Sequence, residues 1–416
     1  MYRKPEFEPV RSEMIEILSK QLPFLNRKRL LAVSMADGRV SGEDVYASYD
    51  LPNRPVSAFD GIAIAWDRLR DQTENDSLFW QEGHDFIYSN TGVAIPDGFD
   101  TVIAIECVQK LEDGHISLSE GSFPKEPGEN VEPAGSQIQK GECLLKKGER
   151  ITPERIGLLL AAGVTALEVY EMPRVMILPT GDELVPAGGS EVPPGTNVET
   201  NGAMLCALLR RFGADAVAGG ILPDDPERLR GALLRASRAA DLIVIGAGSS
   251  KGSKDFTIDA LRDLGEVIVQ EIGVAPGKHV CLARIGGVPV IGVPGPPGGA
   301  LLAGRYYLRQ AISILTTGRP APLFGFEAEL TGGRAGGLGI DFIQPVKPFW
   351  RDGKLYVKPL TILEETRAAA CDLGAAVLYC PKKHPFEEGE RVRVELPDVL
   401  EAPAGMHCGE WNLQIS

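Results

Sequence analysis

Residues 175–184 of the chain read VMILPTGDEL. The four apolar residues predict a strand that is buried on both faces, and it stops at a Thr-Gly turn followed by Asp182 and Glu183. In open α/β sheets, ligands bind just outside the carboxyl ends of the strands. Two acids at such a strand end predict metal coordination or the orientation of a polar ligand. A solvated turn or a cap of the next segment is the simpler alternative.

An apolar strand followed by a glycine-rich loop recurs twice downstream. GAGSSKGSKD at 246–255 follows the strand LIVI at 242–245, and PGPPGGA at 294–300 follows VIGV at 290–293. Backbone N–H groups in such loops form anion-binding concavities, and two lysines add positive charge to the first loop. The GxxxxGK[ST] order of a P-loop is absent. The alternative for the loop at 246–255 is an ordinary β–α loop, and for the loop at 294–300 it is that the glycines serve close helix–sheet packing instead of ligand binding. The candidate ligand contacts in these loops are Gly248, Ser249, Ser250, Lys251, Gly252, Gly295 and Gly298.

Further charged residues flank the predicted strands. Asp225 is predicted to cap a helix because proline follows it, so the preceding Asp224 is the better candidate ligand, or else a turn acid. Asp255 precedes an apolar helical segment and is an N-cap, a site acid or both. Lys278 adds a cation. His279 beside it is of a type that lies at the surface more often than in a ligand site.

Length and composition narrow the class of protein. The 416 residues are too many for one core and predict two to four domains. The net charge of -14 argues against binding to nucleic acid or to an acidic membrane, but not against a small anionic ligand held by local cations or a divalent metal. No apolar run is long enough for a membrane span. Seven cysteines without a Cys-x-x-Cys pair indicate reduced thiols and a cytoplasmic protein.

The order of strands and helices predicts the architecture. Over 173–318 they alternate, which predicts a mainly parallel, doubly wound sheet with strands near 175–178, 216–221, 242–245, 266–272 and 288–293. Residues 11–36 are predicted to be helical and 45–140 to be rich in short strands. Five apolar runs between 324 and 396 predict a small β-barrel or sandwich.

Taken in order, short motifs resemble the molybdopterin molybdenumtransferase family, which includes MoeA and the C-terminal domain of gephyrin. They are SAFDG at 57–61, NTG at 90–92, PDG at 96–98, GENV at 128–131, IGLL at 156–159, PRV at 173–175, TGDEL at 180–184, Asn201, DDP at 224–226, Gly252 with Asp255, PGK at 276–278 and PG at 294–295. The resemblance implies a multidomain α/β and β protein. Its expected parts are an interrupted helical domain at 1–44 and 140–172, a β-rich insert at 45–139, a doubly wound, MogA-like α/β domain at 173–318 and a C-terminal β-barrel at 319–416.

The resemblance also implies an activity. The expected reaction is insertion of molybdate or tungstate into adenylylated molybdopterin, with Mg²⁺ and release of AMP, in a homodimer whose cleft lies between subunits. Carried over by position, the expected catalytic residues are Asp60, Glu183, Asp224 and Asp255, with the last three as metal ligands. Thr91 and Lys278 are expected to contact the anionic pterin.

The chain also departs from the family pattern. Gln137 stands where an aspartate is expected, Ala275 where lysine is usual, and the glycine loops at 246–250 and 294–299 differ. The retained acids favour an enzyme. The departures favour a non-catalytic paralogue that binds or carries a pterin cofactor, or that acts as a partner module.

Overall fold

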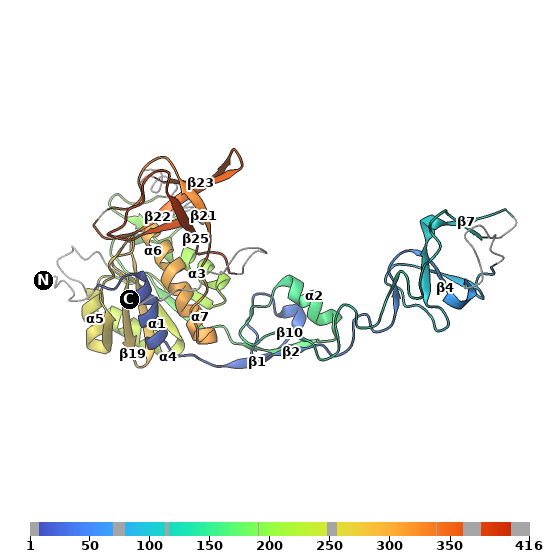
Figure 1. The fold of residues 1–416 in the computed structure, drawn as a ribbon. Helices are drawn as coiled ribbons and strands as arrows, with labels where there is room; N and C mark the ends of the chain where they lie inside the picture. Colours follow the sequence, from blue (N-terminus) through green and yellow to red (C-terminus); the bar gives the residue numbers. More distant parts are fainter. Residues whose placement is uncertain are drawn as a thin grey trace. The chain divides into compact units, whose positions relative to one another are not determined.

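The computed structural model describes residues 8–69, 80–112, 116–189, 191–247, 256–337, 339–360 and 376–400 (Figure 1). The chain forms two compact units, Lys28–Val169 and Met1–Arg27 with Tyr170–Ser416. The finer division into four domains stays a prediction. Among the described residues, no helix is both long and apolar enough to cross a membrane.

The larger unit is built on a six-stranded sheet in the order β15-β12-β16-β20-β19-β17. Its strands are β12 (Arg174–Leu178), β15 (Asp215–Ala218), β16 (Leu242–Ala247), β17 (Glu266–Val269), β19 (Cys281–Ile285) and β20 (Val288–Pro294). β15, β12, β16 and β20 pair in parallel, whereas β19 is antiparallel to both of its neighbours. The predicted doubly wound sheet is confirmed, and β19 is a strand that the sequence pattern did not predict.

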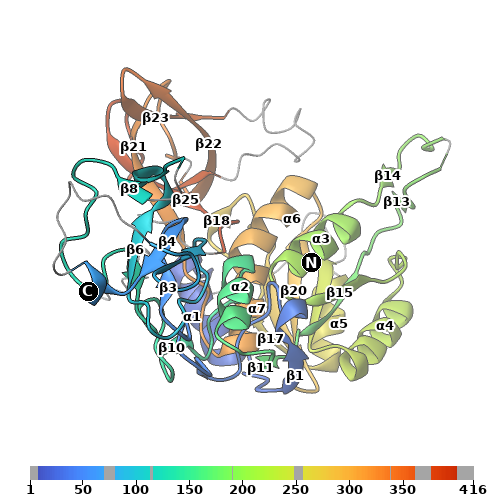
Figure 2. The same cartoon turned by 90° about the vertical axis from the view of Figure 1, so that its right-hand side faces the viewer.

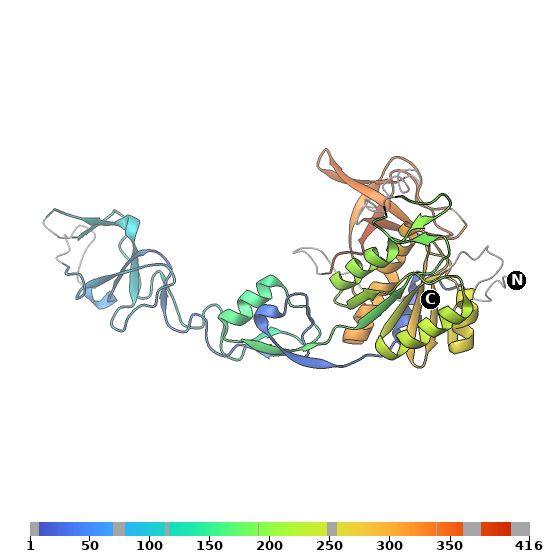
Figure 3. The same cartoon turned by 180° about the vertical axis from the view of Figure 1, so that it is seen from behind.

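Helices cover both faces of this sheet (Figures 1 and 3). They are α1 (Arg11–Gln21), α3 (Asn201–Arg211), α4 (Pro226–Ala239), α5 (Phe256–Leu264), α6 (Pro297–Ala303), the π-helical turn η4 (Gly304–Leu308) and α7 (Arg309–Thr317). Val175 and Val244 belong to one core with α1, α3, α6, η4 and α7. Ile243 and Ile245 belong to a second core with α4 and α5. Burial on both faces explains why these strands are continuous apolar runs.

The predicted helix over residues 11–36 is wrong beyond Gln21. There α1 ends, and the chain continues as β1 (Lys28–Ala32) and the 3₁₀ turn η1 (Val33–Met35). Pro23 has no N–H for a helical hydrogen bond. Asn26 adopts a positive φ of 48°, which a helix does not allow.

A hairpin reverses the chain between β19 and β20. Its turn is made by Gly286 and Gly287, whose φ angles of 56° and 89° suit the two-residue turns that need positive φ. Cys281 at the start of β19 pairs with Gly292 near the end of β20. The amino end of β19 therefore lies at the same sheet edge as the carboxyl ends of β12, β16 and β20.

The C-terminal region is a closed barrel, shown in orange and red in Figure 2. Its strands are β21 (Phe324–Leu330), β22 (Asp341–Arg351), β23 (Lys354–Pro359), β24 (Val377–Cys380) and β25 (Arg391–Leu396). They pair in the order β22-β23-β21-β25-β24, and β24 pairs again with β22, which closes the ring. A sixth strand, β18 (Val274–Ala275), joins β22 from outside. The predicted C-terminal barrel is confirmed.

The Lys28–Val169 unit consists mainly of short strands. They are β2 (Val45–Tyr46), β3 (Val56–Ser57), β4 (Gly61–Ile64), β5 (Phe86–Ser89), β6 (Thr101–Ala104), β7 (Val108–Lys110), β8 (Ile116–Leu118), β9 (Val131–Glu132), β10 (Cys143–Leu145) and β11 (Ala166–Tyr170). The helix α2 (Pro153–Ala161) begins after Thr152, whose hydroxyl accepts a hydrogen bond from the Arg155 N–H at 3.3 Å. Thr152 is therefore the N-cap of α2, with Pro153 at the first helical position. β4 begins with glycine because a Cβ at Gly61 would lie 2.1 Å from the carbonyl oxygen of Ile103.

Asp241 anchors the two segments through which the larger unit connects to the smaller one. Its buried carboxylate accepts hydrogen bonds from both Nη atoms of Arg27, at 2.9 and 2.6 Å, and from the Arg174 N–H at 2.8 Å. Burial alone raises the pKa of Asp241, but the hydrogen bonds from Arg27 and Arg174 outweigh it and hold the pKa at about 2.

We expect Asp241→Asn to lower the free energy of unfolding at pH 7 by about 2 kcal/mol, because the ionised carboxylate stabilises the folded state. A lowered folded-state pKa gives stability that is present above the ordinary value of 3.8 and is lost as the pH falls towards about 2. Denaturant unfolding over this range should therefore show the variant and the wild type converging. Asp259→Asn, at an exposed site on α5, is the matched control. A difference that stays constant down to the lowest pH would contradict the explanation.

Candidate functional site

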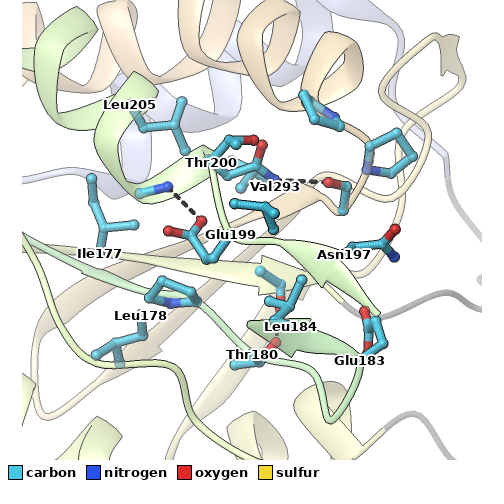
Figure 4. Close-up of a pocket in the computed structure, with 18 of the residues that line it drawn as sticks. Ile177, Leu178, Thr180, Glu183, Leu184, Asn197, Glu199, Thr200, Leu205 and Val293 are labelled. Atoms are coloured by element: carbon cyan, nitrogen blue, oxygen red, sulfur yellow. Dashed lines mark hydrogen bonds between the residues drawn. The ribbon is translucent and has the colours of Figure 1, made fainter. Parts of the chain in front are cut away.

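A cavity of about 630 Å³ lies at the carboxyl edge of the sheet (Figure 4). Thr180 and Glu183 line it after β12, Gly246 lines it at the end of β16, and Gly295 lines it after β20. Three successive strand ends thus contribute to one hollow. This is the position that the open α/β sheet predicts for a ligand.

A short pair of strands, β13 (Leu184–Val185) and β14 (Asn197–Val198), forms a further wall. They pair in parallel, with Leu184 opposite Asn197, at the base of the green arm in Figure 2. Asn197 and Glu199 line the cavity as a result. The Glu199 carboxylate also accepts a hydrogen bond of 2.7 Å from the Gly202 N–H in the first turn of α3. This contact fixes the start of α3 against the cavity.

Two side chains join the strand ends inside the site. The Thr180 hydroxyl donates to the Gly246 carbonyl at 3.0 Å, and the Asn201 amide donates to the Gly295 carbonyl at 2.7 Å. The other amide atom of Asn201, Oδ1, is buried and accepts no hydrogen bond from the described residues. A buried acceptor without a donor is costly, so a ligand that brings an N–H or O–H group would stabilise this position.

Three carboxylates gather beside the cavity. Two backbone hydrogen bonds, Gly181 N–H to Leu222 O at 3.1 Å and Leu222 N–H to Pro179 O at 2.8 Å, align their loops. The Asp224 N–H then donates to Asp182 Oδ1 at 3.0 Å. Burial raises the pKa of Asp224, and the nearby negative charges of Asp182 and Glu183 raise it further. The structure thus brings the predicted Glu183 and Asp224 into electrostatic contact.

Oxygen ligands of this kind suit Mg²⁺. Burial is the first cause of the raised pKa of Asp224, and the charges of Asp182 and Glu183, which a cation would offset, add to it. Within the described part of the chain, however, no three His, Cys, Asp or Glu side chains form a ready metal-binding group. The third expected ligand, Asp255, lies outside the described residues. The metal site of Glu183, Asp224 and Asp255 stays a prediction.

Asp60 and Thr91 meet in the smaller unit. One carboxylate oxygen of Asp60 accepts hydrogen bonds from the Thr91 N–H at 2.7 Å and from its hydroxyl at 3.2 Å. The pairing of Gly61 with Ser89 between β4 and β5 brings the two residues together. Both are exposed, so they are accessible to a ligand, while the contact also serves to order the loop. Their expected roles in catalysis and ligand binding stay predictions.

Of the residues predicted to contact a ligand from the loops and from Lys278, only some are described, and they differ in whether they line the cavity. Gly295 lines the cavity, whereas Gly298 lies inside α6 and is not a lining residue. Lys278 pairs with Glu8 at 3.7 Å and with Glu271 at 3.6 Å. The remaining five, Gly248, Ser249, Ser250, Lys251 and Gly252, lie outside the described residues.

The sequence pattern did not predict most of the lining residues, among them Asn197, Glu199 and His279. For Asn197 and Glu199, the sequence signal is the polar run after the Pro-Pro-Gly turn at 193–195. That run reaches the cavity only because β14 pairs with β13, and the sequence pattern does not predict this pairing. His279 was expected at the surface. It reaches the cavity because it precedes β19, the strand that was not predicted.

Comparison with known proteins identifies the family of two long regions of the chain. The MoeA N-terminal region (domain I and II) matches residues 10–163, and the probable molybdopterin binding domain matches residues 176–313, which include the strand ends around the cavity. A molybdopterin molybdenumtransferase of Haemophilus influenzae is 32% identical over 321 residues, covering 74% of this chain and 77% of that protein. One of Bacillus subtilis is 26% identical and covers 86% of this chain and 87% of its own length.

A crystal structure of a molybdopterin biosynthesis MoeA protein from Pyrococcus horikoshii aligns over 94% of this chain and 99% of that chain, with a TM-score of 0.73 and 26% identity. The fold and the two family matches therefore define a MoeA-like protein whose α/β domain matches the probable molybdopterin binding domain. The chain belongs to the molybdopterin molybdenumtransferase family. This confirms the resemblance drawn from its motifs.

The crowding of carboxylates can be tested by titration. In Asp182→Asn we expect the pKa of Asp224 to fall, because one negative neighbour is lost while the amide oxygen still accepts the Asp224 N–H. Carboxyl ¹³C chemical shifts followed against pH would measure it. Asp352→Asn in the distant hairpin between β22 and β23 is the control, since Asn tolerates its positive φ of 49°. An unchanged Asp224 pKa in Asp182→Asn would refute the electrostatic account.

Proposed function

We propose that this protein inserts molybdate or tungstate into adenylylated molybdopterin and releases AMP. The observation that carries the proposal is the cavity at the ends of β12, β16 and β20, with acids on one side, in a domain of the molybdopterin-binding type. The molybdopterin molybdenumtransferase name of the relatives supports the same reaction.

The lining of the cavity suits a pterin. A pterin ring carries amino and ring N–H donors, and the lining offers the acceptors Asn201 Oδ1, Glu183 and Glu199. The Asn201–Gly295 and Glu199–Gly202 hydrogen bonds hold two of these groups before a ligand arrives. Such preorganisation favours binding and positioning over chemistry by the side chains themselves.

We place Mg²⁺ at Glu183, Asp224 and Asp255. When bound, the cation would neutralise charge on the adenylate phosphate and on the incoming oxyanion. The contribution of this chain is the pair Glu183 and Asp224; burial first, and then the charges of Asp182 and Glu183, raise the pKa of Asp224. Asp60, with Thr91 holding its carboxylate, is proposed as a further catalytic contact. We further propose that the protein is cytoplasmic, in keeping with its unpatterned cysteines, and that it is a homodimer, as the family resemblance implies.

The alternative is a carrier that binds a pterin cofactor without catalysis. Two observations favour it. The Gln137 amide, at a position where an acid is expected, is engaged with Glu132 at 2.8 Å. Ala275, at a position where lysine is usual, pairs with Phe342 of the barrel and offers no charge.

The two functions are separated by an AMP-release assay with adenylylated molybdopterin, Mg²⁺ and molybdate. We expect AMP release by the wild type, and a loss of about 100-fold or more in Glu183→Gln and Asp224→Asn, because each removes a negative charge that positions the cation. Asp352→Asn should behave as wild type. Pterin binding without AMP release would establish the carrier, and neither binding nor release would reject both functions.

A further inference from the structure

The walls of the cavity are mainly apolar. Ile177, Val198, Leu205 and Val293 are among the lining side chains. The lining residues all belong to the described part of the chain, and they include no lysine or arginine. A volume of about 630 Å³ is within the range of sites that hold a small organic ligand. Apolar walls that carry a few placed polar groups suit a planar ring better than a phosphate.

The charged groups of the lining also act against an anion. Its acidic side chains are Glu183 and Glu199. Its histidine, His279, faces the buried carboxylate of Glu271, with Nδ1 3.2 Å from Oε1. The start of α3, where backbone N–H groups would attract an anion, already holds the Glu199 carboxylate through the Gly202 N–H at 2.7 Å. A phosphate in this position would therefore meet like charges without a lysine or arginine to offset them.

Glu199 is the lining acid placed to contact a ring. Its Oε1 accepts the hydrogen bond from Gly202, and its Oε2 has no hydrogen-bond donor among the described residues. The Glu199 N–H donates to Val185 O at 2.8 Å, so the backbone of the residue is fixed as well. Figure 4 shows Glu199 apart from Glu183, the acid that we assign to the metal. Glu199 thus offers a held carboxylate to the interior of the cavity.

The pterin ring carries donors that match this carboxylate. Its exocyclic 2-amino group lies next to the ring N3–H, and two adjacent donors suit the two oxygens of a carboxylate. Adenine has one exocyclic amino group, and the ring nitrogen beside it only accepts hydrogen bonds. Asn201, two residues after Glu199, lines the same cavity and adds a buried amide oxygen without a donor among the described residues. Acceptors at the start of α3 therefore favour the pterin edge over adenine.

We propose that the cavity holds the pterin ring of the substrate, that the Glu199 carboxylate accepts hydrogen bonds from its 2-amino group and N3–H, and that the phosphate stays outside the cavity. This inference rests on the proposed function for its substrate class. It adds the part of the substrate that the cavity binds and the residue that selects it. Glu183 stays with Asp224 beside the cation, so one acid of the lining serves the ring and the other serves the metal.

The test is calorimetric binding of ring probes to the full-length protein. The probes are 6-hydroxymethylpterin, its counterpart without the 2-amino group, and adenine. We expect the wild type to bind 6-hydroxymethylpterin about tenfold or more tightly than either of the others, because each of these lacks a donor for the carboxylate. Inorganic phosphate should not displace it. In Glu199→Gln the affinity for 6-hydroxymethylpterin should fall about tenfold or more, whereas the probe without the amino group should lose much less.

Glu387→Gln is the matched control, because Glu387 is an exposed glutamate between β24 and β25 that pairs with Arg334 at 3.1 Å. The amide oxygen in Glu199→Gln can still accept the Gly202 N–H, so the start of α3 is kept. Four results would each overturn the inference. They are a wild type that binds no ring probe, equal affinity for the probes with and without the 2-amino group, displacement of the ring by phosphate, and wild-type affinity in Glu199→Gln.

The AMP-release assay keeps the two proposals apart. Selective binding of the ring that depends on Glu199, without AMP release, leaves this inference standing and rejects the proposed catalysis. AMP release together with any of the four contrary binding results rejects this inference and leaves the proposed function standing.

Discussion

The parallel direction of β12, β16 and β20 is the constraint on which the site depends. Parallel neighbours end at one edge, so Thr180, Gly246 and Gly295 meet although more than a hundred residues separate the first from the last. The strands hold this arrangement because helices bury both of their faces. Hydrogen bonds from Thr180 and Asn201 then fix the loops that leave the edge. A hollow with rigid walls follows from the topology before any catalytic side chain is considered.

The sequence predicts those features of the sheet that depend on a local pattern of residues. The run VMIL followed by Pro-Thr-Gly-Asp-Glu predicts a buried strand with a site at its end. The strand is found, and Thr180 and Glu183 after it line the cavity, while their function stays a prediction. β19 was missed because its five residues include an arginine and its Gly-Gly turn was not recognised as a hairpin signal. That omission had a direct consequence. Without β19, nothing in the sequence places His279 near the ends of the parallel strands.

The carboxylates show a second limit of sequence reasoning. Glu183 and Asp224 follow different strands, and their proximity is a fair inference from the sheet edge rule. The raised pKa of Asp224 does not follow from the sequence. Its first cause is burial, and its second is the negative charge of Asp182, whose side chain accepts a hydrogen bond from the Asp224 N–H. Like charges held this close destabilise the folded protein unless a cation joins them. Retaining them is what a binding site requires, at the expense of local stability.

Contacts between distant segments are the least predictable feature. Arg11 of α1 pairs with Glu395 of β25, 384 residues away, and Tyr306 of η4 donates to the same carboxylate at 2.6 Å. The Arg11 guanidinium also lies 3.8 Å from the ring centre of Tyr379 in β24. A buried charge that loses its partner typically destabilises a protein by about 3–5 kcal/mol. Displacement of α1 or β25 would therefore leave the other with an unpaired buried charge. The N-terminal helix, η4 of the α/β region and the barrel are therefore coupled through one buried charge cluster.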